Sequence, residues 1–266
     1  MALPARLILK QGGTGKSARD AIMQGLAVTG ILNGSDLEET PVWPNMKLPF
    51  LLLFARNSSP KSDHQFHFVT PIRENQLSIR GLFRVDYKAA ETVSTRSVIE
   101  KPWLLKALAV GTVLDVEVID RLSQGSVADF WKANDLYYRK GYDVSPDLEQ
   151  RSATDLLELP DFDISDGSFS IGPDLQTWRK RHRRETAHSP RKLALYKSPL
   201  VIVPQAQGES RDQPKAFISR SWPVAFSQSN YGFSAAGSED GEEFASLLYL
   251  VVHSELFQHF CLMNSP

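Results

Sequence analysis

Five cationic side chains lie within one short run of the sequence, and their chemistry suits an anionic ligand. The run follows Trp178 and contains Arg179, Lys180, Arg181, Arg183 and Arg184. Guanidinium and ammonium groups that neutralise phosphates release counterions, and this release supplies sequence-independent affinity for nucleic acid. The run therefore predicts a nucleic-acid contact. A solvated basic helix face, or a basic signal read by another protein, is the alternative.

A glycine-rich segment near the N-terminus comes within one residue of a phosphate-binding loop. Residues 10–17 read K-Q-G-G-T-G-K-S, and the pattern requires glycine where Lys10 stands. That first glycine allows the sharp turn through which successive N–H groups converge on a phosphate, and Lys10 could adopt it only with strain. We predict an ordinary loop that enters a helix, with Thr14 or Ser17 as its cap. Nucleotide binding by the loop from Gly12 to Ser17 is the alternative function.

Other patterns that could support catalysis or metal binding are incomplete. His64 and His67 are three residues apart in a predicted strand, so their rings point to opposite faces and do not converge on a metal. Residues 161–167 resemble a calcium loop but lack its closing glutamate. The sequence contains no Gly-x-Ser-x-Gly, Asn-Pro-Pro-Tyr or Asp-Pro-Pro-Tyr segment and no Phe-x-Gly-x-Gly loop. We therefore expect no catalytic residue, metal site or cofactor site in this chain.

Composition is that of an ordinary globular protein. The chain has 266 residues, of which 42% are hydrophobic and 23% are charged. The longest strong apolar run, residues 50–54, has the length of a strand and is too short to span a membrane. The N-terminal residues show no basic leader and no cleavage site. The single cysteine, Cys261, is expected to be a small core residue and suits a reducing compartment. We expect a cytoplasmic protein without membrane contact.

Charge is distributed unevenly along the chain, although the formal net charge is only −1. Residues 1–112 carry 14 Lys and Arg against 9 Asp and Glu, whereas residues 113–166 carry 5 against 13. Residues 167–266 carry 11 against 9, and seven of those eleven cations fall within 179–192. An acidic middle between two mildly basic ends favours an anionic partner at the ends.

Apolar patterning predicts an α/β region at the start of the chain. A helix is expected at 17–26, with Ala18, Ile22, Gly25 and Leu26 on its apolar face. Strands are expected at 28–33, 50–54 and 66–71. Because only about ten polar residues join the last two strands, we expect them to pair antiparallel within a mixed sheet.

The rest of the chain is predicted to be helical and then mixed. Helices are expected at 102–108, with Pro102 at the first helical position, and at 127–131 and 153–159. Residues 113–122 fit either a strand or a helix, and we favour the helix. A buried strand between prolines is expected at 199–204, an alternating segment at 226–234 and an amphipathic helix at 242–263.

Residues 42–57, V-W-P-N-M-K-L-P-F-L-L-L-F-A-R-N, resemble the closing strand of the catalytic domain in large N6-adenine DNA methyltransferases of restriction-modification systems. In that family the strand follows the catalytic motifs. Segments 101–108, 115–117, 196–203, 231–233 and 247–256 are similar to further parts of the same family, so the resemblance covers nearly the whole chain. It departs at Val252-His253-Ser254, where the family has Leu-Asn-Ser.

The resemblance implies a C-terminal part of such an enzyme, α/β in class and α+β overall. Residues 1–96 would be the last strands of a Rossmann-like mixed sheet, 97–166 an acidic helical linker, and 167–266 a target-recognition module. That module would bind double-stranded DNA through the basic run, with Lys197 and Tyr231. S-adenosylmethionine is the cofactor of the full-length family, so catalysis would require a separately encoded N-terminal polypeptide. A protein-interaction module, whose basic run meets an acidic partner, is the remaining alternative.

Overall fold

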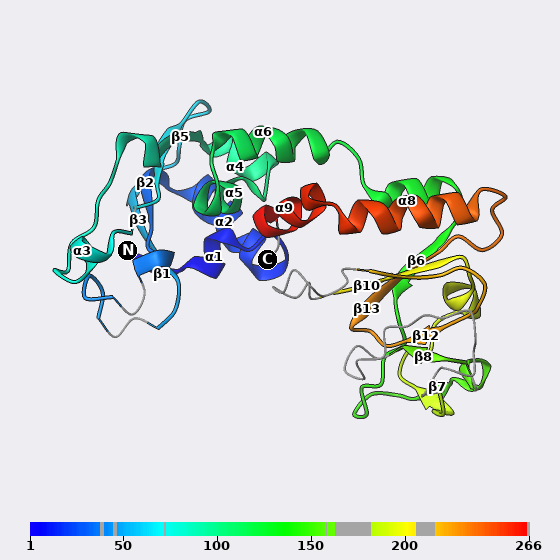
Figure 1. The fold of residues 1–266 in the computed structure, drawn as a ribbon. Helices are drawn as coiled ribbons and strands as arrows, with labels where there is room; N and C mark the ends of the chain where they lie inside the picture. The colour runs from blue at the N-terminus through cyan, green and yellow to red at the C-terminus, as the bar shows by residue number, and fades with distance from the viewer. Residues whose placement is uncertain are drawn as a thin grey trace. The chain divides into compact units, whose positions relative to one another are not determined.

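The computed structural model describes residues 1–37, 40–44, 47–71, 73–157, 159–162, 182–205 and 216–264. Helices and strands are mixed, with two larger sheets and two short strand pairs, which confirms the α+β class (Figure 1). The chain divides into two compact units. The first unit is Met1–Ser123 with His259–Pro266, and the second unit is Gln124–Gln258. The expected three-part division at 96/97 and 166/167 stays a prediction.

The first unit contains a five-stranded mixed sheet with the order β1-β3-β2-β4-β5. Its strands are β1 (Ala2–Pro4), β2 (Ala27–Asn33), β3 (Phe50–Arg56), β4 (Gln65–Val69) and β5 (Ala90–Ser94). Only β2 and β4 pair parallel; the other neighbours pair antiparallel. The three predicted strands are confirmed. The expected antiparallel pairing of β3 with β4 is wrong, because β2 lies between them.

Five helices share one core with this sheet. They are α1 (Ala5–Leu9), α2 (Gly13–Gly25), α4 (Thr95–Glu100), α5 (Leu104–Val110) and α6 (Val113–Leu122). The unit also contains the one-turn helix α3 (Asn75–Ser78) and short 3-10 turns at Ser35–Leu37 and Tyr87–Ala89. Ile8, Met23, Leu105 and Ile119 meet the sheet residue Phe66 in this core. The helix preferred for 113–122 is therefore confirmed as α6.

Two helix details differ from the sequence prediction. Helix α5 begins at Leu104 with Trp103 as its N-cap, so Pro102 precedes the helix. The most deeply buried positions of α2 are Gly15, Arg19 and Met23, one position away from the predicted apolar face. The first difference shifts a boundary by one turn at most. The second places Arg19 on the buried face of α2, which was expected to be formed by Ala18, Ile22, Gly25 and Leu26.

The second unit contains a four-stranded antiparallel sheet with the order β11-β10-β13-β6. The strands are β6 (Tyr137–Lys140), β10 (Leu200–Pro204), β11 (Phe217–Ser219) and β13 (Asn230–Ser234). All five residues of β10 are buried, as expected for the apolar run between prolines. Two core clusters include alternate residues of β10, with Leu200 and Ile202 in one and Val201 and Val203 in the other.

Helices and short strands complete the second unit. Helices α7 (Val127–Ala133) and α8 (Gly241–His253) pack with one core cluster, and Trp131 of α7 donates its indole N–H to the carbonyl of Ser234 (3.2 Å). Strands β7 (Arg151–Ser152) and β9 (Thr186–Ala187) pair antiparallel, while β8 (Asp161–Phe162) and β12 (Ala225–Phe226) pair parallel. The helix predicted at 153–159 is a single 3-10 turn, Thr154–Leu156. Further 3-10 structure spans Leu193–Tyr196.

The predicted terminal helix is interrupted at Ser254. Helix α8 ends at His253, and α9 (Glu255–Asn264) follows Ser254, whose backbone is extended at φ −68° and ψ 146°. The Ser254 hydroxyl accepts the N–H of Phe257 (3.2 Å), which is the contact of a helix N-cap. Cys261 on α9 is half-buried instead of deep in the core, and burial raises the pKa of its thiol.

Gly141 and Gly232 lie against Phe226 in the second unit. A Cβ at Gly232 would collide with the Phe226 ring, and a Cβ at Gly141 would collide with the Phe226 carbonyl. Phe226 is fully buried and packs edge-to-face on Tyr196, with ring centroids 5.1 Å apart. Both glycines are therefore required by the close approach of a neighbour, and neither has a positive φ.

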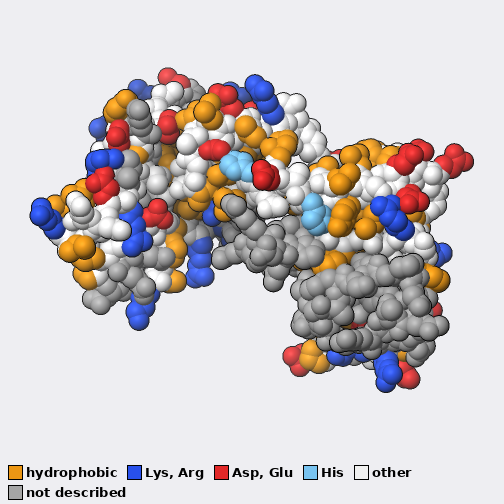
Figure 2. Space-filling view, in the orientation of Figure 1, with side chains coloured by type: hydrophobic (Ala, Val, Ile, Leu, Met, Phe, Trp, Pro, Cys, Tyr) orange, Lys and Arg blue, Asp and Glu red, His pale blue; other side chains and the backbone are white. Residues whose placement is uncertain are grey.

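Hydrophobic side chains remain exposed on α8 of the second unit (Figure 2). Leu247 and Leu250 are 60% and 65% exposed on this helix. Across the described parts of the chain, no helix combines the length and the apolar character needed to cross a bilayer.

Candidate nucleic-acid interface

The basic run identified in the sequence is described only from His182 onward. Arg179, Lys180 and Arg181 lie outside the described residues. Arg183 and Arg184 lie within them, and both side chains are exposed. In the described part of the chain neither arginine forms an ion pair, so both guanidinium groups are available to a ligand.

His182 fixes the end of this run inside the second unit. Its side chain is fully buried, and its N–H donates to the carbonyl of Leu159 (2.8 Å). Ring atom Nε2 donates to the Arg184 carbonyl (3.1 Å), while Nδ1 lies 3.4 Å from a carboxylate oxygen of Asp161. The Tyr142 hydroxyl lies 3.0 Å from both Asp161 oxygens, and its ring meets the His182 ring edge-to-face at 4.7 Å. A buried polar network therefore fixes the backbone between His182 and Arg184.

The chain after His182 continues beside residues 151–159. The N–H of Ala153 donates to the Glu185 carbonyl (2.7 Å), and Arg151 pairs with Ala187 in the β7–β9 register. The side chains of Arg183 and Arg184 thus extend from a backbone segment that is hydrogen-bonded both before and after these two residues. Long cationic side chains on a fixed backbone can follow a phosphate backbone without ordering the chain first.

Tyr231 and Lys197, the other two predicted DNA contacts, belong to a different part of the second unit. Tyr231 is half-buried on β13 opposite Lys140 of β6, whose Nζ lies 5.5 Å from the Tyr231 ring centroid. This is the distance of a cation–π contact. Lys197 is exposed, and its carbonyl accepts the hydroxyl of Ser234 at the far end of β13 (2.8 Å). Tyr231 and the Lys197 carbonyl thus lie near opposite ends of β13, whereas Arg183 and Arg184 precede β9, which pairs with β7.

Two cationic residues that the sequence analysis did not single out contribute to this region. Lys140 supplies the cation on Tyr231. Arg191, at φ 67°, donates from Nε to the carbonyls of Lys140 and Gly141 (3.2 Å each) and from Nη1 to the Ser189 hydroxyl (2.6 Å). The clustering of cations in 179–192 indicated Arg191, but only the fold shows that it holds the edge strand β6.

Tyr196 adds a rigid buried point directly before Lys197. Its hydroxyl donates to the Pro190 carbonyl (2.9 Å), and burial raises its pKa far above the ordinary value of a phenol. The phenol therefore remains protonated, and a hydrogen-bond donor, through the neutral pH range. This contact fixes Lys197 relative to the segment that follows β9.

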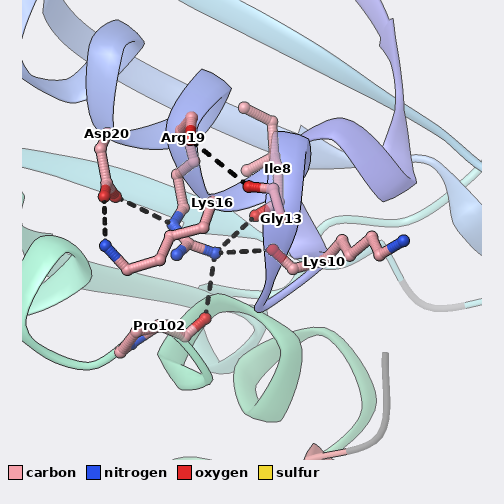
Figure 3. Close-up of polar contacts among 8 residues, drawn as sticks. Ile8, Lys10, Gly13, Lys16, Arg19, Asp20 and Pro102 are labelled. Atoms are coloured by element: carbon pink, nitrogen blue, oxygen red, sulfur yellow. Dashed lines mark hydrogen bonds and ion pairs between the residues drawn. The ribbon is translucent and has the colours of Figure 1, made fainter.

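The glycine-rich loop differs from a phosphate-binding loop in three respects. The element before it is helix α1 instead of a strand, and the positive φ of 59° is at Gly13, whereas Lys10 is at −69°. Lys16 forms an ion pair with Asp20 one turn further along α2 (2.7 Å; Figure 3). The expected caps are wrong, because Gly12 is the N-cap and Ser17 donates to the Gly13 carbonyl within the helix (3.4 Å).

The two histidines considered for a metal site have structural contacts. His64 lies 2.6 Å from the Val28 carbonyl through Nε2, and His67 lies 3.4 Å from the Thr92 hydroxyl through Nδ1. Among the described residues, no cluster of three or more His, Cys, Asp or Glu side chains could hold a metal. Most of the acidic segment 161–167 lies outside the described residues.

Comparisons with known proteins leave the family of this chain unassigned. No protein-family model and no curated protein matches it. Among solved structures, the type IIG restriction endonuclease BpuSI is similar at a TM-score of 0.29 and 12% identity. The match covers 97% of this chain and 36% of that one, so this chain spans little more than a third of that enzyme's length.

Proposed function

We propose that the second unit binds double-stranded DNA as the target-recognition part of an N6-adenine DNA methyltransferase of a restriction-modification system. Transfer of the methyl group from S-adenosylmethionine would then require a partner polypeptide that supplies the cofactor loop and the Asn-Pro-Pro-Tyr segment. The methyltransferase part of this proposal rests on the sequence resemblance of residues 42–57, 101–108, 115–117, 196–203, 231–233 and 247–256. The DNA-binding part also rests on the geometry of the second unit.

The observation that carries the DNA-binding proposal is the burial of His182 within the basic run. A basic run on a solvated helix would keep its histidine at the surface, whereas His182 is 0% exposed and hydrogen-bonded to Arg184. The burial orders Arg183 and Arg184, which have no competing carboxylate among the described residues. Phosphate contacts from such residues fix the register of a protein on DNA, while base contacts supply specificity.

A salt titration of DNA affinity tests this proposal. The double variant Arg183→Gln/Arg184→Gln removes two phosphate contacts, so the slope of log affinity against log salt should become shallower by about 1.8. Affinity at about 0.1 M salt should fall roughly tenfold or more. Fluorescence anisotropy with a labelled duplex measures both quantities. The chain alone should transfer no methyl group from S-adenosylmethionine to the same duplex.

Arg220→Gln is the matched control. Arg220 is also an exposed arginine of the second unit, but its guanidinium is held by Glu242 (2.8 Å) and Ser246 (2.9 Å). This variant should leave the salt slope unchanged. An absence of DNA binding even at low salt would contradict the proposal and favour an acidic protein as the partner of the basic run. Equal slopes for the double variant and the control would remove Arg183 and Arg184 from the interface.

A further inference from the structure

The first unit contains a cavity of about 650 Å³ next to the carboxyl ends of β1 and β2. Strands β1 and β2 both pair antiparallel with β3, which lies between them, so they run in the same direction. The cavity is lined by residues that follow β1 and β2, by the residues before β3 and by one side of α5. In open α/β sheets, ligands bind in the crevice at the carboxyl ends of the strands. The volume lies within the usual range for small-molecule sites.

Side-chain hydrogen bonds tie the walls of this cavity together. Arg19 is 1% exposed, and its Nη1 donates to the carbonyls of Ile8 (3.2 Å), Lys10 (3.1 Å) and Pro102 (3.1 Å), as Figure 3 shows. One guanidinium therefore connects the end of α1 with the residues that lead into α5. Asn33, at the end of β2, donates from Nδ2 to the Ala109 carbonyl on α5 (3.4 Å). The cavity is held open between elements that are fixed to each other.

The charges that line the cavity are mainly positive. Among the described residues, Arg6, Lys10 and Lys106 line it together with one carboxylate, Asp36. None of the three cations forms an ion pair or a side-chain hydrogen bond within the described residues, and the Lys10 side chain points away from Arg19 in Figure 3. Unpaired cations that line one cavity favour an anion there, because each ammonium or guanidinium can donate a charge-assisted hydrogen bond.

The rest of the lining is apolar. Leu9, Pro49 and Val110 contribute aliphatic surface next to the cations. A bare inorganic anion would leave this surface and most of the volume unfilled. We propose that the cavity binds a phosphate-bearing organic ligand of nucleotide size, with its phosphate on Arg6, Lys10 and Lys106 and its apolar part on this wall. This site lies in the first unit and is separate from the proposed DNA contact, which lies in the second unit.

Calorimetric titration of the full chain tests the proposal. The probes are the 5′-mononucleotides, the corresponding nucleosides and a single-stranded oligonucleotide. A mononucleotide should bind and its nucleoside should not, because the phosphate provides the attraction. The double variant Arg6→Gln/Lys106→Gln should weaken binding about tenfold or more, since it removes two charge-assisted contacts. Asp36→Asn should tighten binding a few-fold, because it removes the negative charge that the described residues contribute to the lining.

Arg96→Gln is the control variant of the first unit. Arg96 is exposed and forms its ion pair with Glu100 (2.7 Å) outside the cavity lining, so nucleotide binding should be unchanged. Binding of the oligonucleotide, but not of free nucleotides, with the same dependence on Arg6 and Lys106 would support the site and identify a strand phosphate as its ligand. Equal affinity for nucleotide and nucleoside would overturn the proposal.

The cavity and the DNA contact can fail independently. Arg183→Gln/Arg184→Gln should leave nucleotide binding by the first unit unchanged. If Arg6→Gln/Lys106→Gln disturbs folding, as thermal melting would show, the gain expected from Asp36→Asn still decides the question. Unchanged affinity in all cavity variants with intact melting would also overturn the proposal.

Discussion

Each unit of this protein uses one deeply buried cationic or ionisable side chain to position exposed cations. In the first unit, Arg19 fixes the backbone of Lys10; in the second, His182 fixes the backbone of Arg184. The two solutions differ chemically. Arg19 keeps its charge and has only carbonyl acceptors on Nη1, with Asp20 at 3.7 Å from Nε. His182 has an acceptor near each ring nitrogen, the Asp161 carboxylate at Nδ1 and the Arg184 carbonyl at Nε2.

Arg19 and His182 differ in how much their burial destabilises the fold. Burial of a charge is unfavourable, and it lowers the pKa of Arg19, although Asp20 partly offsets this effect. Nε and Nη2 of Arg19 have no hydrogen-bond partner among the described residues. His182 belongs to a hydrogen-bond network with Tyr142 and Asp161, so its position does not depend on any single hydrogen bond. We therefore expect the first unit to depend more strongly on its one arginine than the second unit does on its histidine.

Arg19→Met should have the largest effect. The change removes the donor to three carbonyls, and an unsatisfied buried acceptor costs on the order of 1–3 kcal/mol, so we expect a loss of about 3 kcal/mol after the relief of the buried charge. Hydrogen exchange followed by mass spectrometry should show faster exchange in the first unit only. Arg96→Met, at an exposed site of the same unit, is the control. Unchanged exchange at residues 5–25 would contradict the comparison of the two units, because Arg19 would then contribute nothing measurable to the stability of the first unit.

His182→Ala should have the next largest effect, a loss of roughly 2 kcal/mol, because it removes a buried ring and its hydrogen bonds. Faster exchange should appear at residues 151–159 and 182–187. The salt slope for DNA should also become shallower, since Arg183 and Arg184 lose their fixed backbone. His188→Ala, which removes a less buried histidine bonded to the Glu149 carbonyl (3.0 Å), provides the matched control. A larger loss than in Arg19→Met would reverse the ranking of the two units.

Trp131→Phe should cost about 1 kcal/mol, the contribution of one buried hydrogen bond. The change removes the indole N–H that donates to Ser234 but retains an aromatic ring against Phe233, which now lies edge-to-face at 5.6 Å. Chemical denaturation measures the loss. A value near that of His182→Ala would show that the aromatic core, and not the polar network, dominates the second unit. Phe130→Leu, at a 42% exposed position, should change stability less.

Asp115→Asn should have the smallest effect, below about 1 kcal/mol, and it should depend on pH. The pKa of Asp115 is lowered, chiefly because the Thr112 hydroxyl donates to its carboxylate (2.8 Å), with a further contact from His259 (2.8 Å). Since the folded-state pKa lies below the unfolded value, the stabilisation is complete above the unfolded pKa of about 3.9 and is lost as pH falls through the folded pKa. Urea unfolding across this window should therefore show a flatter acid-side decline in the variant.

Asp143→Asn provides the corresponding test in the second unit. The pKa of Asp143 is also lowered, chiefly because the hydroxyl of Ser145 donates to its carboxylate (2.7 Å). Its replacement should leave the acid-side decline of the first unit unchanged. An equal effect on exchange in both units would mean that the acid response belongs to the whole chain.

The strands were predictable where the sequence carries a local apolar run. Strands β3 and β10 each follow a proline and are apolar over five residues, so their positions depend little on the rest of the chain. The partner of β3 was not predictable in the same way. Insertion of β2 between β3 and β4 is set by packing between segments far apart in the sequence, and the short connection from β3 to β4 suggested a hairpin instead.

The features that position the candidate sites were the hardest to predict. Arg19 occupies a helix position at which sequence patterning expects an exposed side chain, and its three acceptors come from residues 8, 10 and 102. His182 stands among arginines, and nothing in its neighbours indicates that it reaches Asp161. A charge run can be read from the sequence, whereas the buried residue that orders it depends on long-range contacts. The DNA contacts at Arg179, Lys180 and Arg181 stay a prediction.

The packing of Phe226 on Gly141 and Gly232 links three positions that lie far apart in the sequence. Gly232 cannot acquire a side chain while the Phe226 ring is in place, and Gly141 cannot because it lies against the Phe226 carbonyl. Replacement of either glycine alone is therefore expected to be deleterious, yet at Gly232 the same replacement can be tolerated when a smaller residue stands at 226. In an evolving lineage or a selection experiment, positions 226 and 232 should accordingly change together. When one of the two residues is kept unchanged, the other should be almost invariant.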